Sequence, residues 1–130
     1  MGYSTNFSGE IHIDPPLTWG QIKDSPYLPE HAVRNGWDVK FLVAEEAVET
    51  DEGVVTKRVA TALVPLTDEA YKGYDIIKSV NGIIADYPDH SFSGRFDCKG
   101  DDAGDLWRLV VRGRVAEKVV PRIVWPDEEA

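Results

Sequence analysis

The residues best suited to acid–base or metal chemistry are a histidine and an aspartate two positions apart, His12 and Asp14. They lie in a run in which apolar and polar residues alternate, so both side chains are expected on one face of a β-strand. With Asp97 from a neighbouring strand they would form the centre of a small metal-dependent hydrolase. Because one His beside one Asp is a common pair, this hydrolase is an alternative and not the main hypothesis.

A second group of carboxylates lies around a glycine-containing turn and consists of Asp97, Asp101, Asp102 and Asp105. Ca²⁺ prefers such oxygens in a flexible loop, but the acids do not follow the alternate spacing of a calcium loop and no closing glutamate is present. No glycine-rich phosphate loop follows a strand either. We therefore expect no metal site, no cofactor and no catalytic residue, so that an enzyme is the less favoured interpretation.

Three large aromatic side chains, Trp19, Tyr27 and Trp37, lie in or beside a long irregular region. Trp and Tyr, together with Arg, are the usual anchors of protein interfaces. The polar sides of the alternating runs add three further candidates for partner binding, Glu10, His12 and Arg95. These six residues predict a non-enzymatic protein-interaction module. The structural alternative is that the aromatic residues close the ends of the core.

The net charge of −9 limits the kinds of partner. Nucleic-acid binding is disfavoured, because affinity for the phosphate backbone comes largely from Lys and Arg. An acidic surface suits an inhibitor or immunity-type protein that occupies a basic site on its partner, since opposite fields steer association. It also serves solubility alone. The expected partner is a protein of unknown identity, and a homodimer is compatible with the sequence.

Strands must position these candidate site residues. The tripeptide Phe-Ser-Gly occurs twice, at residues 7–9 and 92–94. Each copy opens an alternating run, which predicts two strands of one antiparallel sheet with a buried and a polar face. Further strands are expected at 38–49 and 54–64, joined by an acidic hairpin turn, and at 106–112 and 115–125. Pro15 and Pro16 are expected to end the first strand.

The helical signals are fewer. Thr18 is expected to cap a short helix over 19–23, residues 24–37 to form a long connection, and Thr67 to cap a long helix over 68–87. The predicted fold class is therefore α+β: one domain with a single antiparallel sheet of about five to six strands and one long and one short helix packed on one face. The expected core contains Phe7, Ile11, Phe92, Phe96, Ile77, Val80 and Ile84.

The single cysteine, Cys98, lies on the apolar side of the second Phe-Ser-Gly strand and is expected to be a small core residue. One cysteine cannot form an intramolecular disulfide, which favours a reducing compartment. No stretch approaches the roughly 20 apolar residues of a membrane span. We therefore expect a soluble cytoplasmic protein, with residues 126–130 as a frayed acidic tail.

Five stretches carry distinctive sequence, at 1–5, 7–19, 22–26, 104–108 and 122–126, and include Gly-Asp-Leu-Trp-Arg and Arg-Ile-Val-Trp-Pro. In these stretches the chain resembles an uncharacterised family of small proteins from actinobacteria and their phages. The resemblance covers nearly the whole chain. It implies a cytoplasmic or phage-encoded accessory protein and carries no catalytic residue or ligand to these positions.

Overall fold

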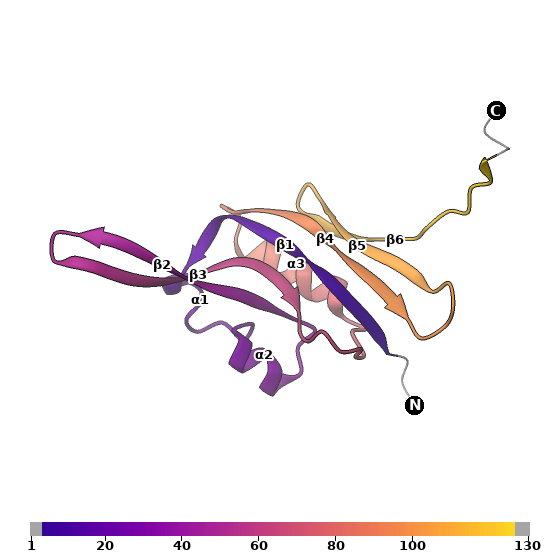
Figure 1. The fold of residues 1–130 in the computed structure, drawn as a ribbon, viewed down its shortest axis with the longest axis horizontal. Helices are drawn as coiled ribbons and strands as arrows, with labels where there is room; N and C mark the ends of the chain where they lie inside the picture. Colours follow the sequence, from indigo (N-terminus) through magenta and orange to yellow (C-terminus); the bar gives the residue numbers. More distant parts are fainter. Residues whose placement is uncertain (1–3, 127–130) are drawn as a thin grey trace.

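The computed structural model describes residues 4–126 and contains six strands in one antiparallel sheet (Figure 1). The strand order is β2-β3-β1-β4-β5-β6. The strands are β1 (Thr5–Thr18), β2 (Val39–Thr50), β3 (Gly53–Pro65), β4 (Ser91–Gly100), β5 (Leu106–Arg112) and β6 (Val115–Val119). The helices are α1 (Trp19–Ile22), α2 (Pro29–Asn35) and α3 (Ile76–Asp86). The predicted number of strands is confirmed.

One face of the sheet is buried and the other is open, because side chains alternate along each strand. Phe7, Ile11 and Phe96 on the inner face are buried, whereas Glu10 and Arg95 on the outer face are exposed. All but one of the predicted core residues are buried, namely Phe7, Ile11, Phe92, Phe96, Val80 and Ile84. Ile77 is only half-buried, and the helix instead buries Ile76 and Ile83.

The two Phe-Ser-Gly copies occupy equivalent positions in the β1–β4 pair. Gly9 lies opposite Phe96, and Gly94 lies opposite Ile11, so the motifs are related by a local two-fold axis through the Glu10–Arg95 pair. Both glycines have positive φ, +114° and +130°. The carbonyl of the facing strand packs where their side chains would be. The repeat therefore marks a symmetric close approach of two strands.

The prediction of an α+β fold with one long and one short helix is wrong. The sheet dominates, and the three helices have only 4, 7 and 11 residues. Residues 68–75 are not helical because Tyr71 forms an isolated antiparallel bridge with Thr5, with backbone bonds of 2.9 and 3.0 Å in the two directions. Gly73 lies directly under the Phe7 ring. Tertiary contacts thus outweigh the local helical pattern.

Three smaller boundaries also differ from the prediction. β1 continues through Pro15 and Pro16, because the register against β3 shifts between His12 and Leu17 and proline is tolerated at such irregularities. The connection at 24–37 contains α2, which begins at a proline and ends before Gly36 in the left-handed conformation. β6 ends at Val119 instead of residue 125.

Polar side chains form hydrogen bonds to the backbone at the end of α3 and along the edge of β6. The Arg114 guanidinium donates to the carbonyls of Ile84, Tyr87 and His90 at 2.5, 3.2 and 2.7 Å, around the C-terminal end of α3. The Asn81 carboxamide accepts from the Ala116 N–H at 2.8 Å and donates to the Ala116 carbonyl at 3.1 Å. Arg114 thus adds donors where helix carbonyls lack intrahelical partners, and Asn81 pairs backbone groups on the edge strand β6.

Asp38 joins the start of β2 to the loop before α3. Its carboxylate accepts from the Asp75 N–H at 2.9 Å, and its carbonyl accepts from the Tyr71 hydroxyl at 2.5 Å. Burial raises the pKa of the Asp38 carboxyl above its usual value, and the Asp75 N–H only partly offsets this. The charged form is therefore disfavoured in the folded state.

We expect Asp38→Asn to raise the Tm at pH 7.5. A carboxyl whose folded pKa is raised causes a loss of stability as the pH rises through the folded pKa, and a neutral amide removes that loss. The difference should vanish at pH 3.5, where the native carboxyl is itself largely protonated. Thermal melts over this pH range measure the effect, with the exposed Asp24→Asn as a control. A lower Tm for Asp38→Asn at pH 7.5 would show that the ionised carboxylate is the better partner for the Asp75 N–H.

Within residues 4–126, no helix is long and apolar enough to cross a membrane. The predicted acidic tail at 126–130 lies outside the described residues, apart from Pro126.

Candidate functional site

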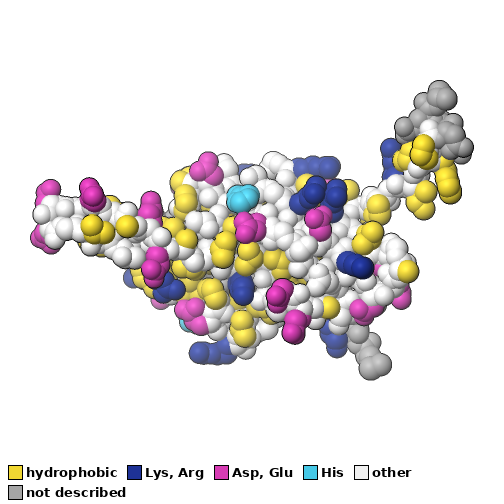
Figure 2. All heavy atoms as spheres, viewed as in Figure 1, with side chains coloured by type: hydrophobic (Ala, Val, Ile, Leu, Met, Phe, Trp, Pro, Cys, Tyr) yellow, Lys and Arg dark blue, Asp and Glu magenta, His cyan; other side chains and the backbone are white. Residues whose placement is uncertain are grey.

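The β2–β3 hairpin projects beyond the rest of the molecule as a two-stranded ribbon (Figure 1). We call residues 45–58 the arm. Every residue of the arm is exposed except the half-buried Val48, and Val54 is 68 % exposed. The arm turns at Gly53, where φ is +118°, and the Thr50 hydroxyl donates to the Gly53 carbonyl at 2.8 Å. Figure 2 shows acidic side chains distributed along it.

A groove of about 690 Å³ lies at the base of the arm. We call it the Trp19 groove, and its walls include Pro16, Trp19, Glu46, Lys57, Arg58 and Val59. The Arg58 guanidinium lies 4.8 Å from the centre of the Trp19 ring, a cation–π contact. Trp19 is 37 % exposed. An aromatic side chain flanked by both signs of charge is suited to binding a protein segment.

Trp19 is positioned by the bend at the end of β1 and the first turn of α1. The Thr18 N–H donates to Gln21 Oε1 at 2.9 Å, so Trp19 is the first residue of a capped helix. The bend is held by His90, whose Nδ1 lies 2.6 Å from the Pro15 carbonyl oxygen and whose Nε2 lies 3.1 Å from Gln21 Nε2. Because a carbonyl only accepts, Nδ1 carries the proton and Nε2 accepts from the amide.

His90 and Gln21 were not among the predicted site residues. Their contacts join positions 69 and 75 residues apart in the chain, so no local sequence pattern indicates them. The same holds for Arg58, which reaches Trp19 because β3 pairs with the end of β1 and places Val59 opposite Thr18. A cation on an alternating strand is by itself an ordinary surface residue.

Tyr27 and Trp37 lie elsewhere. Their ring centres are 5.4 Å apart, and Tyr27 is half-buried against Phe41. Burial raises the pKa of the Tyr27 hydroxyl. Trp37 is 38 % exposed and precedes β2, whereas Trp19 contacts the hairpin at Arg58. Arg58 is paired with Glu45, six residues along β2 from its first residue, Val39. This is roughly 20 Å, so the three aromatic residues do not form one surface.

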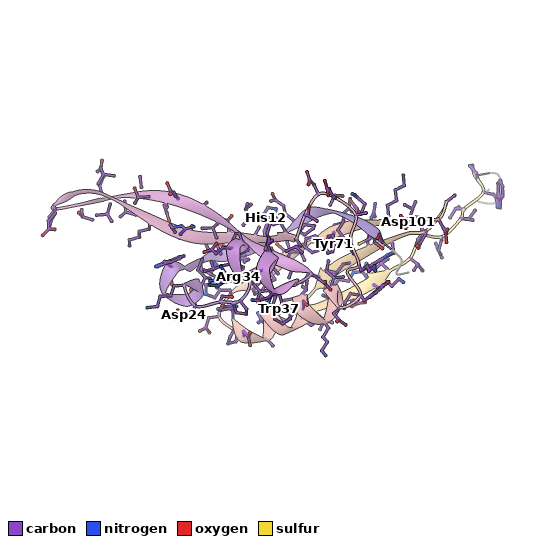
Figure 3. All side chains as sticks on the ribbon, turned by 90° about the horizontal axis from the view of Figure 1, so that it is seen from below. His12, Asp24, Arg34, Trp37, Tyr71 and Asp101 are labelled. Carbon is purple, nitrogen blue, oxygen red and sulfur yellow. The ribbon has the colours of Figure 1, made fainter. Side chains whose placement is uncertain are left out.

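Glu10, His12 and Arg95 lie together on the open face of the sheet. Glu10 and Arg95 are cross-strand neighbours, and His12 Nδ1 is 4.0 Å from Glu10 Oε2. Arg95 also approaches Asp97 at 3.5 Å. Figure 3 places His12 on this open face and Trp37 on the side of the helices. The six predicted binding residues therefore fall into three separate groups.

The residues of the hydrolase alternative are only partly brought together. His12 and Asp14 share the open face of β1, but Asp97 lies opposite Ser8, whereas Ser93 is the partner of His12. Asp97 accepts from Arg108 Nε at 2.9 Å. Within the described residues, no group of three or more His, Cys, Asp or Glu side chains is placed to hold a metal ion. Cys98 is buried, and burial raises the pKa of its thiol to about 12, so it is protonated at neutral pH.

These features define a class of protein: a single antiparallel sheet with one face covered by short helices, one face open, and a projecting hairpin. The model of a family of unknown function, DUF6205, matches residues 1–130, and the chain belongs to that family. This confirms the predicted membership of an uncharacterised family. No curated protein and no solved structure matches the chain.

Proposed function

We propose that this protein is a non-enzymatic protein-interaction module that binds its partner through the arm and the Trp19 groove. The observation that carries this proposal is the arm itself, a ribbon whose described residues are almost all exposed. Isolated two-stranded ribbons are marginal in water, so their retention outside a core favours a role in contact with another molecule. The exposed Val54 and Val55 offer apolar area for such a contact.

The charge of the arm indicates the chemistry of the partner. It carries five acids and two bases, a net charge of −3, at Glu45, Glu46, Glu49, Asp51, Glu52, Lys57 and Arg58. A protein with a basic surface would be steered towards it. Trp19 at the base would supply the apolar anchor, since Trp is enriched among residues that dominate binding energy.

The resemblance of the sequence to actinobacterial and phage proteins supports a cytoplasmic, phage-related accessory role. The buried, unpaired Cys98 agrees with a reducing compartment. If the captured partner is an enzyme that loses activity on binding, the module acts as an acidic inhibitor.

We expect removal of the arm to abolish partner binding without unfolding the body. Replacing residues 45–58 with Asn-Gly joins the paired residues Ala44 and Val59 by a two-residue hairpin turn. The Tm should change by only a few degrees, because the deleted residues contribute almost nothing to the core. Affinity purification from a host lysate with mass spectrometry identifies the partner, and titration of that purified partner measures the loss.

The Trp19→Ala variant tests the groove separately and should weaken binding by about 2 kcal/mol or more, or about 30-fold in Kd. Arg95→Ala on the open face is the matched control and should bind normally. Full binding by the arm-deleted variant together with loss in Arg95→Ala would move the interface to the open face.

A further inference from the structure

A second exposed apolar feature lies at the opposite end of the molecule from the arm. We call residues 120–126 the apolar segment, which leaves the sheet after β6 (Figure 1). Ile123 is 87 % exposed and Trp125 is 62 % exposed. Figure 2 shows hydrophobic side chains gathered on this segment, away from the body. Pro121 and Pro126 bracket its Arg-Ile-Val-Trp sequence, which favours an extended conformation.

The register explains why the apolar segment has no place on its own sheet. Val119 lies opposite Arg108, so Pro121 falls opposite Leu106, the first residue of β5. The residues after Pro121 run past the end of β5, the strand with which β6 is paired. Trp125 is four residues further on, or roughly 13 Å in an extended chain. The apolar side chains of the segment therefore lie beyond the end of the sheet.

A groove of about 520 Å³ lies on the open face beside the point where the apolar segment leaves. We call it the Leu106 groove, and its apolar lining includes Leu106, Trp107 and Val119, with Val120 and Pro121 at the start of the apolar segment forming one wall. Leu106 is half exposed. The charged residues of its lining are Lys99, Arg108 and Asp97, a net charge of +1, and Arg108 is paired with Asp97.

We propose that the occupant of the Leu106 groove is the apolar segment of a second copy of this chain. Each molecule carries both the apolar segment and the apolar groove. The segment does not fill the groove of its own copy, because it extends past the end of the sheet. The charges agree, since Asp127, Glu128 and Glu129 follow Trp125 in the sequence and the groove carries Lys99 and Arg108. The arm, with its net charge of −3, would repel these acidic residues and is therefore the less suitable docking site for the apolar segment.

The position of the segment also indicates a closed dimer. Because the segment starts at the wall of the groove, a two-fold axis that brings two Leu106 grooves side by side lets each segment cross into the other copy. Such a reciprocal contact closes on itself and does not propagate into a filament. A docked Trp buries about 150–250 Å², so two short segments form a small interface, of the size that is typical of weak or transient complexes.

Sedimentation velocity of the full chain from about 1 to about 200 µM tests this proposal in the range expected for a small interface. The mass should rise from 14.5 kDa towards twice that value. The double variant Ile123→Ser/Trp125→Ser should remain monomeric at every concentration with an unchanged Tm, since both side chains lie outside the core. A wild-type chain that stays monomeric, or a double variant that still dimerises, overturns the proposal.

The groove is tested by Leu106→Glu, which places a charge against the docked apolar segment and should also give a monomer. Val54→Ser removes an exposed apolar side chain from the arm and is the control, which should dimerise like the wild type. Dimerisation that survives Leu106→Glu overturns the groove assignment. If only Val54→Ser loses dimerisation, self-association belongs to the arm and the proposal is overturned. Binding of a partner protein by the arm is a separate measurement, so the two proposals can fail independently.

Discussion

Phe96→Ala is expected to lower the free energy of unfolding by about 3–5 kcal/mol, which is the usual cost of deleting a buried phenylalanine ring. Phe96 is fully buried at the centre of β4, between Gly9 of β1 and Leu109 of β5. Since Gly9 has no side chain, the cavity left by the ring cannot be filled from that neighbour. Urea unfolding monitored by tryptophan fluorescence measures the change.

Ser93→Ala is the control for this experiment, because Ser93 lies on the open face of the same strand and is exposed. Its effect should stay within about 0.5 kcal/mol. A loss below about 1 kcal/mol in Phe96→Ala would contradict its place at the centre of the core.

Gly94→Ala is expected to destabilise the fold by about 2–4 kcal/mol, and Gly9→Ala by a similar amount. A residue forced into a backbone region that suits only glycine costs about 1–3 kcal/mol. The added Cβ at Gly94 would also lie 2.4 Å from the Glu10 carbonyl oxygen, and that at Gly9 would lie 2.5 Å from the Arg95 carbonyl oxygen. These atoms belong to the paired backbones, so β1 and β4 must separate to relieve the contact.

Gly82→Ala provides the matched control for the glycine variants. Gly82 lies within α3, and nothing lies within 4 Å of the position of its Cβ. Alanine should therefore stabilise the helix by about 0.5–1 kcal/mol. Chemical denaturation of all three variants gives the comparison. Equal effects at Gly94 and Gly82 would mean that the local two-fold contact has no energetic significance.

The candidate site was only partly predictable. The sequence indicates Trp19 as a binding residue, and the structure brings it to the base of the arm. It does not indicate Arg58 or His90, because their partners come from distant segments. Tyr27 and Trp37 stack on each other, away from Trp19. Proximity along a loop therefore did not predict proximity in space.

The alternation of apolar and polar residues was enough to predict both Phe-Ser-Gly strands and their buried side chains, because a strand with one buried face imposes a two-residue period on its sequence. The β2–β3 hairpin followed from two runs rich in Val and Thr on either side of a turn that contains Gly53. Val80 and Ile84 of the core followed from helical spacing. Pro29 and Gly36 are residues that favour the start and the end of a helix, but they lie in a segment that was interpreted as a loop.

Other features were decided only by tertiary contacts. The expected long helix shortens because Tyr71 bonds to Thr5 and Gly73 packs under Phe7. β1 passes its two prolines because the register against β3 shifts there. In both cases the deciding contact joins residues far apart in the chain, and local propensity is too weak to oppose it. The end of β6 at Val119 is different, because Pro121, two residues further on, is a strand-ending residue that the sequence itself contains.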